Sequence, residues 1–553
     1  MIEQDDKGIG GDTAGRWNRL QVALLLVVLG LVGVVVLRGV SVGEFHFNVD
    51  EAQQSVTGLF FADFLRDLPL SNPVGYAYQY YAQYPALGLV HWPPFFHFSE
   101  GVMFLLLGPS VVAARLTVLI FALIGLFFWY RLVCELQNEW AAAVSTVLLA
   151  FLPTMLLFEK LVMLEIPAMA MCMGATYLWV RYLREGSGWS LAWFTLLASL
   201  ALLTKQHTVY LAVFCLLTLL GFGRWRRLGS WKLIAAFLVS LLLVGPFYWL
   251  AFRLHLSTII TDTLHIVRSN EISYWEYFQL FPKMLPDQLG MVLLVLSFIG
   301  IASCWWTGRR EITVVMLSWI ASCYVVLTLV AYPESRQIMF WLPPFSYFAV
   351  APLTTSRLPR RFIPVAAVVV LGLAGTTTIR AWGYQRPYIS GYEKVAREVV
   401  QSSKSPFVLF DGEVPGNFVF FMRAHDPERR FFVLRKVLYS SRIVTGQGGV
   451  ELAHSREDIQ RLIDEYGIEH IVVLNDIPLY FKSQKMLREL LVEPPYVLVE
   501  KIMIETNDRQ WKGRYLLHYR NSRPSRPSAK ELRLKMLTLD RDIVIPMNGS
   551  PKK

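Results

Sequence analysis

Long apolar runs separated by short polar segments fill the first 380 residues of the chain. Eleven of these runs reach or approach the length at which a helix crosses a bilayer. They cover residues 20–37, 111–130, 140–158, 161–182, 191–204, 208–222, 233–252, 289–306, 312–331, 338–353 and 362–379. Residues 95–107 are apolar but short, and we expect an interfacial or re-entrant helix there. The pattern predicts a polytopic α-helical membrane protein with about 11 to 13 transmembrane helices.

The composition agrees with this interpretation. Hydrophobic residues make up 54% of the 553 positions and the mean hydropathy is +0.41, which is too apolar for an ordinary soluble protein of this length. The net charge is +11, and the basic residues are scattered between the apolar runs. We therefore expect contact with anionic lipid headgroups and no nucleic-acid partner. The five cysteines have neither the spacing of a metal site nor that of a disulfide framework.

The charges of the short loops predict the orientation, because cytoplasmic loops are enriched in Lys and Arg. The basic loops contain Arg181, Arg184, residues 224–227, Arg309, Arg310, Arg357, Arg360 and Arg361. With these loops in the cytoplasm, residues 20–37 form an uncleaved first span that follows a cytoplasmic N-terminus. Nearly every unusual polar residue then lies at the outer face of a plasma (cytoplasmic) membrane, together with the C-terminal part of the chain.

The composition changes after residue 379, and three regions follow from it. Residues 1–380 are the predicted transmembrane domain, with a long outer loop over residues 41–94. Alternating short strands and helices predict a small soluble α/β domain over residues 381–520, without a Gly-rich phosphate loop or a catalytic signature. The tail, residues 521–553, is basic and contains Pro and Ser, so we expect it to be poorly ordered.

The outer loop contains the adjacent carboxylates Asp50 and Glu51. Like charges side by side repel each other, and partial burial makes their ionisation costlier. One interpretation is a solvated pair that starts a loop helix with Asp50 near its N-terminus. The other is a catalytic pair. In the same loop His91 precedes Pro93 and Pro94, which fix the chain direction. His91 is either an aromatic-belt residue or a catalytic one.

Further polar residues lie at the ends of apolar runs, where they are costly unless they are useful. Glu165 precedes Pro167 and is either a favourable helix N-terminal acid or a functional carboxylate. Lys205 either extends to the interface or binds a phosphate. Arg336 forms either an exposed pair with Glu334 or a bidentate phosphate contact. Arg268 belongs to a larger outer loop that could fold over a substrate.

These elements recur together in a family of membrane enzymes. They are an Asp-Glu pair after the first span, a (Lys or His)-x-Pro-Pro-like element, Ala114-Arg115-Leu116, an acidic residue before the middle spans, a Leu-Thr-Lys element, and a late Arg before Leu342-Pro343-Pro344. In this order, over about the first 380 residues, the chain resembles the GT-C membrane glycosyltransferases. It is most similar to the protein O-mannosyltransferase and aminoarabinose transferase (ArnT-like) group.

The resemblance implies a polyprenyl-phosphate-linked sugar donor and an acceptor on the outer side of the membrane. It makes Asp50 the catalytic acid of the pair and Glu165 the second acidic position. Lys205 and Arg336 match positions near the donor phosphate. The chain departs from the pattern twice, because His91 stands where many relatives have Lys and Gln337 where many have Tyr.

We therefore predict an inverting glycosyltransferase whose acceptor is a lipid, a glycan or a protein. Asp50 is the expected general base, Glu51 orients Asp50 or a cationic partner, and Glu165 completes the catalytic set. The expected ligands of the donor phosphate are Lys205, Arg336, His91 and Arg268. The carboxylates could bind a divalent metal, but the sequence contains no full ligand set, so no metal site is assigned. A transporter or lipid flippase is the alternative, and a membrane sensor is a third class that leaves Asp50, Glu165 and Lys205 unexplained.

Overall fold

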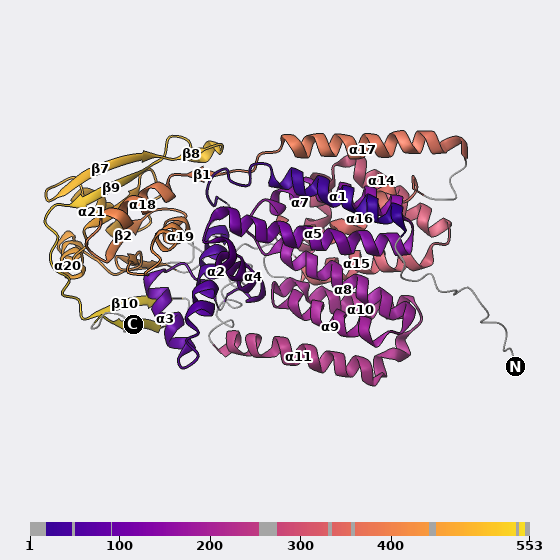
Figure 1. Cartoon of the computed structure of the whole chain (residues 1–553), viewed down its shortest axis with the longest axis horizontal. Coiled ribbons are helices and arrows are strands. Elements are labelled where there is room, and N and C mark those ends of the chain that lie inside the picture. The colour runs from indigo at the N-terminus through magenta and orange to yellow at the C-terminus, as the bar shows by residue number, and fades with distance from the viewer. Residues whose placement is uncertain are drawn as a thin grey trace.

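The computed structural model describes residues 18–46, 50–89, 91–253, 274–329, 334–354, 360–441, 449–537 and 541–547. A bundle of roughly parallel helices forms one part of the molecule, and a mixed α/β domain lies at one end of it (Figure 1). Helices α2 and α4 lie between these two parts, across the direction of the bundle (Figure 1). This layer contains the Asp-Glu pair.

The helices of the bundle account for most of the apolar runs. They are α1 (Arg19–Leu37), α5 (Val111–Leu136), α6 (Glu139–Ala150), α7 (Pro153–Glu159), α8 (Glu165–Glu185), α9 (Gly188–Leu202), α10 (Tyr210–Gly221), α11 (Trp231–Ala251), α13 (Tyr274–Leu289), α14 (Met291–Trp306), α15 (Arg310–Thr328), α16 (Leu342–Val350) and α17 (Ile363–Gly383). Short 3-10 helices connect them, namely η1 (Gln206–Val209), η2 (Trp225–Gly229), η4 (Ser335–Trp341) and η5 (Arg360–Phe362).

By length and composition, five helices in the described part of the chain can cross a membrane: α1, α5, α11, α15 and α17. Two bent pairs, α6 with α7 and α13 with α14, raise this number to seven if each pair is one span. Helices α4, α9 and η1 with α10 are apolar but shorter. The predicted polytopic helical fold is confirmed.

The run 140–158 is not one straight helix, in contrast to the expectation from its hydropathy. Helix α6 ends at Ala150, α7 begins at Pro153, and the two axes differ by 72°. Proline has no N–H to donate and its ring clashes with the preceding turn, so a helix starts at Pro153 more easily than it passes through it. Similarly, α8 starts at Glu165 rather than at residue 161.

The outer loop contains two helices, α2 (Asp50–Asp67) and α3 (Pro73–Gln83), and α4 (Phe95–Leu107) follows it directly. Helix α2 begins with Asp50 and Glu51, where the partial positive charge of a helix N-terminus favours carboxylates. Helix α4 has the bounds expected from its short apolar run. Helices α2 and α4 pack closely, since the Gly101 backbone of α4 lies against Phe61 and Ala62 of α2.

The C-terminal domain contains a five-stranded sheet in the order β3-β2-β6-β9-β7. Strands β3, β2 and β6 are parallel, whereas β9 is antiparallel to both β6 and β7. The elements of the domain are β1 (Ile389–Ser390), α18 (Tyr392–Ser402), β2 (Phe407–Asp411), α19 (Pro415–His425), β3 (Phe432–Leu434), β4 (Tyr439–Ser441), β5 (Gly449–Glu451), α20 (Arg456–Tyr466), β6 (His470–Leu474), α21 (Lys482–Leu490), β7 (Tyr496–Met503), β8 (Glu505–Thr506), η7 (Arg509–Trp511) and β9 (Tyr515–Asn521). The predicted α/β domain is confirmed.

The tail differs from its expectation. Strands β10 (Glu531–Met536) and β11 (Arg541–Pro546) form an antiparallel hairpin. Leu532, Leu534 and Met536 are buried in the domain, while the charged residues between them are exposed. This period-two alternation is the pattern of a half-buried strand. The expectation of a poorly ordered tail is therefore wrong for these residues, because the overall basic composition concealed a local alternation.

Candidate functional site

Four of the polar residues singled out from the sequence form one continuous cluster. Arg336 Nη1 lies 2.9 Å from Asp50 Oδ2, and Arg336 Nε lies 3.5 Å from Glu165 Oε1. Lys205 Nζ lies 2.5 Å from the same Glu165 oxygen. Residues that are 286 positions apart in the chain therefore share one ion-pair network.

Each of these side chains comes from the start of a helical element. Asp50 is the first residue of α2, and Glu165 is the first residue of α8. Lys205 caps the N-terminus of η1, and Arg336 is the second residue of η4. A helix that follows a loop at one end of the bundle has its N-terminus at that end. The four side chains therefore lie at the same end of the bundle.

Burial divides the cluster into two parts. Glu165 is fully buried and Lys205 is 2% exposed, so this ion pair is shielded from water and lies beneath the more exposed pair of Asp50 and Arg336. The side chains of Asp50 and Arg336 are 19% and 14% exposed. The carboxylate of Asp50 is thus the part of the cluster that a second substrate can reach.

Arg336 is shared by three carboxylates, because Glu334 also accepts a hydrogen bond from its Nε. Burial lowers the pKa of Arg336, but Glu165, Glu334 and Asp50 outweigh this effect and hold the pKa above its ordinary value. The guanidinium therefore remains charged. Sequence reasoning treated Glu334 as an exposed partner of little value, and its place two residues before Arg336 was the available signal.

Glu51 accepts hydrogen bonds from backbone groups outside this cluster. The side chain is fully buried. Its Oε2 accepts a hydrogen bond from the backbone N–H of His46 at 3.0 Å, and its Oε1 accepts one from the N–H of Val162 at 3.1 Å. Glu51 thereby connects the start of α2 to the loop that leads into α8. Glu165 follows this loop as the first residue of α8.

His91 lies beside the cluster without a direct ion pair. Its ring contacts Trp92 edge-on, and its carbonyl accepts a hydrogen bond from Gln206 at 3.3 Å. Burial lowers the pKa of His91, and Arg336 lowers it further while Asp50 raises it. A neutral His91 can donate a hydrogen bond but brings no positive charge, unlike the Lys that many relatives have there.

Two other polar residues complete the picture. His207 lies in η1, two residues after Lys205, and interacts electrostatically with Lys205, Glu165 and Arg336. Burial and the two cations lower its pKa to about 3. Arg268 lies outside the described residues. Within the described ranges, no three His, Cys, Asp or Glu side chains are placed to hold a metal ion.

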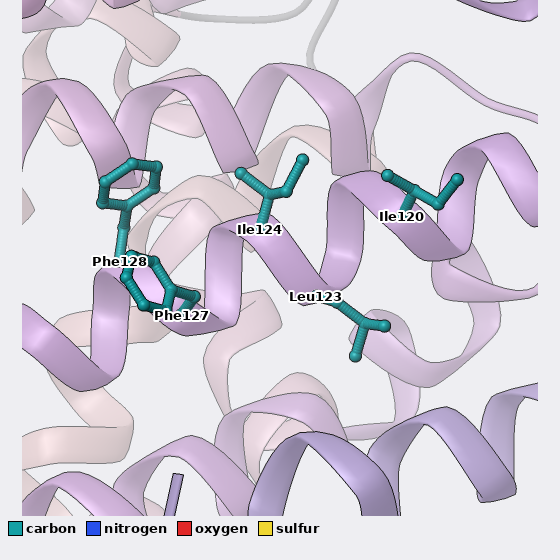
Figure 2. A pocket seen from close by; sticks show the side chains of 5 residues that line it. All are labelled: Ile120, Leu123, Ile124, Phe127 and Phe128. Atoms are coloured by element: carbon teal, nitrogen blue, oxygen red, sulfur yellow. The ribbon is translucent and has the colours of Figure 1, made fainter. Parts of the chain in front are cut away.

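An apolar hollow of about 450 Å³ opens on the surface of α5. It is lined by Ile120, Leu123, Ile124, Phe127 and Phe128, all from this one helix (Figure 2). Only hydrocarbon surrounds it, so the hollow offers space for an alkyl chain and no group for acid-base chemistry. The reactive side chains of the described region are at the ion-pair cluster.

Comparison with known proteins gives a sequence match and several structural ones. Residues 91–249, less than a third of the chain, match the family model described as dolichyl-phosphate-mannose-protein mannosyltransferase. No curated protein matches the chain in sequence. The matched segment contains His91, Glu165 and Lys205.

The fold is similar to that of ArnT from Cupriavidus metallidurans bound to undecaprenyl phosphate. The TM-score is 0.52 with 14% identity, over 90% of this chain and 97% of that chain. It is also similar to the oligosaccharyltransferase of Archaeoglobus fulgidus in complex with Zn and sulfate, with a TM-score of 0.53 and 10% identity over 81% and 67% of the two chains. These comparisons confirm the resemblance to the GT-C superfamily and the GT-C fold.

Proposed function

We propose that this chain is an inverting glycosyltransferase that moves a sugar from a polyprenyl-phosphate donor to a lipid, glycan or protein acceptor. One observation carries the proposal: a reachable carboxylate, Asp50, lies in the same ion-pair cluster as the cations Arg336 and Lys205. Sugar transfer from a lipid phosphate needs a base for the acceptor and cations for the departing phosphate. The cluster supplies both.

The reaction follows from these positions. The acceptor hydroxyl oxygen forms a bond to the anomeric carbon while its proton passes to the Asp50 carboxylate. The bond between the anomeric carbon and the phosphate oxygen breaks, and its electron pair stays on the polyprenyl phosphate. Arg336 has five N–H donors, so it can bind a phosphate oxygen while it remains paired with Asp50. Attack from the face opposite the phosphate inverts the anomeric configuration.

The lipid nature of the donor explains why the enzyme is embedded in a membrane. The similar ArnT structure is bound to undecaprenyl phosphate, which supports a donor of the same polyprenyl class. The basic loops support an outward orientation of the site. The basic η2 and the start of α15 lie at the end of the bundle opposite η1, where the cluster is. The proposed site then faces the outer side of the plasma membrane.

The test is transfer from a panel of polyprenyl-phosphate sugars into membranes, followed by mass spectrometry of lipids, glycans and proteins. Asp50→Asn removes the base and keeps the size of the side chain, so we expect transfer to fall by about 100-fold or more. Asp287→Asn, an exposed carboxylate on α13, is the matched control and retains transfer. Full transfer by Asp50→Asn in a folded, inserted protein contradicts the assignment of Asp50 as the general base.

A transporter or lipid flippase is the second candidate, and the bent pairs favour it. The helix pairs α6 with α7 and α13 with α14 bend by 72° and 113°, and each is either a broken span, as transporters have, or a re-entrant loop. Proteoliposomes that contain a labelled polyprenyl-phosphate sugar separate the two functions. A transferase yields a glycosylated acceptor, whereas a flippase moves the intact donor between leaflets.

A further inference from the structure

We infer that the C-terminal domain is a positioning element of the active site, which sets the location of Asp50 through a close contact between Gly416 of α19 and Ala52 of α2. The inference rests on the proposed role of Asp50 as the base. It assigns a task to a domain in which the sequence shows no catalytic signature. Three sets of contacts support it, and all of them join the domain to α2 or to the segment just before it.

The first set fixes the segment that leads to Asp50. The Glu44 carboxylate accepts hydrogen bonds from the N–H groups of Gly391, Tyr392 and Glu393 at 2.9, 3.1 and 2.9 Å. These N–H groups belong to the start of α18, so a residue of the outer loop caps a helix of the C-terminal domain. The position of this segment therefore depends on the domain.

The next residues continue this attachment. The side-chain amide of Asn417 in α19 donates a hydrogen bond to the Phe45 carbonyl at 2.7 Å. The ring of Phe45 packs edge-on against the ring of Phe420, with 5.0 Å between the ring centroids. His46 Nε2 lies 2.8 Å from Asp508 Oδ2. Phe45 and His46 thus bind three different residues of the domain.

The second set is a backbone approach that only glycine permits. A Cβ on Gly416 would lie 2.7 Å from the Cβ of Ala52 and 3.3 Å from the backbone nitrogen of Gln53. A Cβ atom essentially never lies within 3.0 Å of a non-bonded heavy atom, so one of the two helices would have to move. Ala52 is two residues from Asp50 in the first turn of α2.

The third set fixes the other end of α2. Arg423 of α19 forms a bidentate pair with Asp63, at 2.7 Å from Nε to Oδ2 and 2.5 Å from Nη2 to Oδ1. Both side chains are buried. Arg429 forms a second pair with Asp67. Because the domain binds α2 at its first and last turns, a shift of α19 translates into a shift of Asp50 against Arg336.

The experiment adds and removes one methyl group on each side of this contact. Gly416→Ala introduces the clash, and Ala52→Gly in the same protein removes its main partner. We expect Gly416→Ala to lower kcat by about 10-fold to 100-fold, with a smaller change in the KM for the donor, because misplacement of a base acts on the chemical step. The double variant recovers most of kcat. Gly372→Ala in α17, which has nothing within 4 Å, is the control.

Hydrogen exchange provides a readout that does not require transfer activity. Gly416→Ala should speed exchange of the amides in the first two turns of α2, and the double variant should restore the slow exchange. Wild-type kcat and unchanged exchange in Gly416→Ala overturn the inference. Loss of activity that Ala52→Gly fails to restore also overturns it, since that points to general misfolding. If the wild-type protein transfers no sugar, the proposed function fails, and exchange alone decides whether the domain positions α2.

Discussion

At the residue scale, the important feature is that Arg336 contacts both carboxylates, Asp50 and Glu165. A planar guanidinium presents several N–H groups in fixed directions, which allows one side chain to join two carboxylates and still meet a phosphate. Lys205 differs, because it is a point charge that lies behind Glu165 and is 2% exposed. In the proposed reaction Arg336 is therefore the cation expected closest to the phosphate, while Lys205 pairs with Glu165 behind it.

This difference leads to a prediction for Arg336→Lys. The substitution keeps the positive charge but loses the planar set of N–H donors that contacts several oxygens at once, so we expect kcat/KM for the donor to fall by about 100-fold. Steady-state transfer kinetics with purified protein in detergent measure this value. Arg310→Lys, at the opposite end of the bundle, should match the wild type. Near-normal kinetics for Arg336→Lys mean that a single positive charge suffices at this position.

The residues of this cluster could be named from the sequence, but the ion pairs between them could not. Glu165, Lys205 and Arg336 stand out because polar residues at the ends of apolar runs need a reason, and the loop charges place them on one face. The prediction that Glu51 orients Asp50 or a cationic partner stays a prediction, since neighbouring residues of a helix do not face each other but Glu51 interacts electrostatically with Arg115 and Arg386. Its actual ligands are backbone N–H groups of His46 and Val162, which leave no trace in a sequence.

At the scale of elements, α2 is the structure on which the site depends. It carries Asp50 at one end and Asp63 near the other, and it packs on both α4 and α19. A loop helix with Asp50 near its N-terminus was one of the two interpretations that the sequence left open, and α2 starts at Asp50. The sequence could not predict the partner of that helix, because the contact with α19 joins residues about 360 positions apart. Small residues such as Gly416 and Ala52 carry no pattern that identifies them.

The buried pair between Arg423 and Asp63 provides a test at this scale. Arg423→Met removes the bidentate partner of the buried Asp63 carboxylate and leaves it the Tyr80 hydroxyl and the more exposed Arg66, so we expect a loss of about 3 kcal/mol in the free energy of unfolding. The thermal melting temperature of the purified protein should fall accordingly. Adding Asp63→Leu should recover part of this loss, because it removes the buried charge but also the acceptor of the Tyr80 hydroxyl. Arg397→Met, whose pair with Glu393 is exposed, should change stability by less than about 1 kcal/mol.

At the scale of the whole molecule, direct contacts join the C-terminal domain to the outer loop and α2. The basic η2 and the start of α15 lie at one end of the bundle, and the ion-pair cluster and the domain lie at the other. A change that loosens the domain should therefore reach α2 and the reaction. The domain contains a group that makes this connection testable, since it responds to pH.

His470 on β6 and His518 on β9 lie side by side, with Nδ1 of the first 2.8 Å from Nε2 of the second. Both are 1% exposed. Burial lowers the pKa of His518 from 6.5 to about 4, and the positive charge of His470 contributes to this shift. Burial also lowers the pKa of His470. The carboxylates that face the pair, Glu398, Glu469 and Glu500, do not reverse these shifts.

The sign of the pH effect follows from these values. Between pH 6.5 and 4 the unfolded chain binds a proton at His518 that the folded domain does not, so acidification favours unfolding. Above pH 6.5 His518 is neutral in both states and its ionisation does not affect stability, and the destabilisation grows as the pH falls towards 4. At pH 5 it amounts to a loss of about 2 kcal/mol. We expect the melting temperature of the domain and the slow exchange of β6 and β9 amides to decrease together over this range.

His518→Gln removes the titrating group and should flatten this pH dependence, so comparison of the variant with the wild type at pH 7.5 and pH 5 isolates its effect. Exchange in α2 measured in the same samples then shows whether the domain transmits its loosening to the segment that carries Asp50. If the domain loosens at pH 5 while α2 keeps its protection, the two parts are independent. Because α19 packs against Ala52 through Gly416, we expect α2 to lose protection in parallel with β6 and β9.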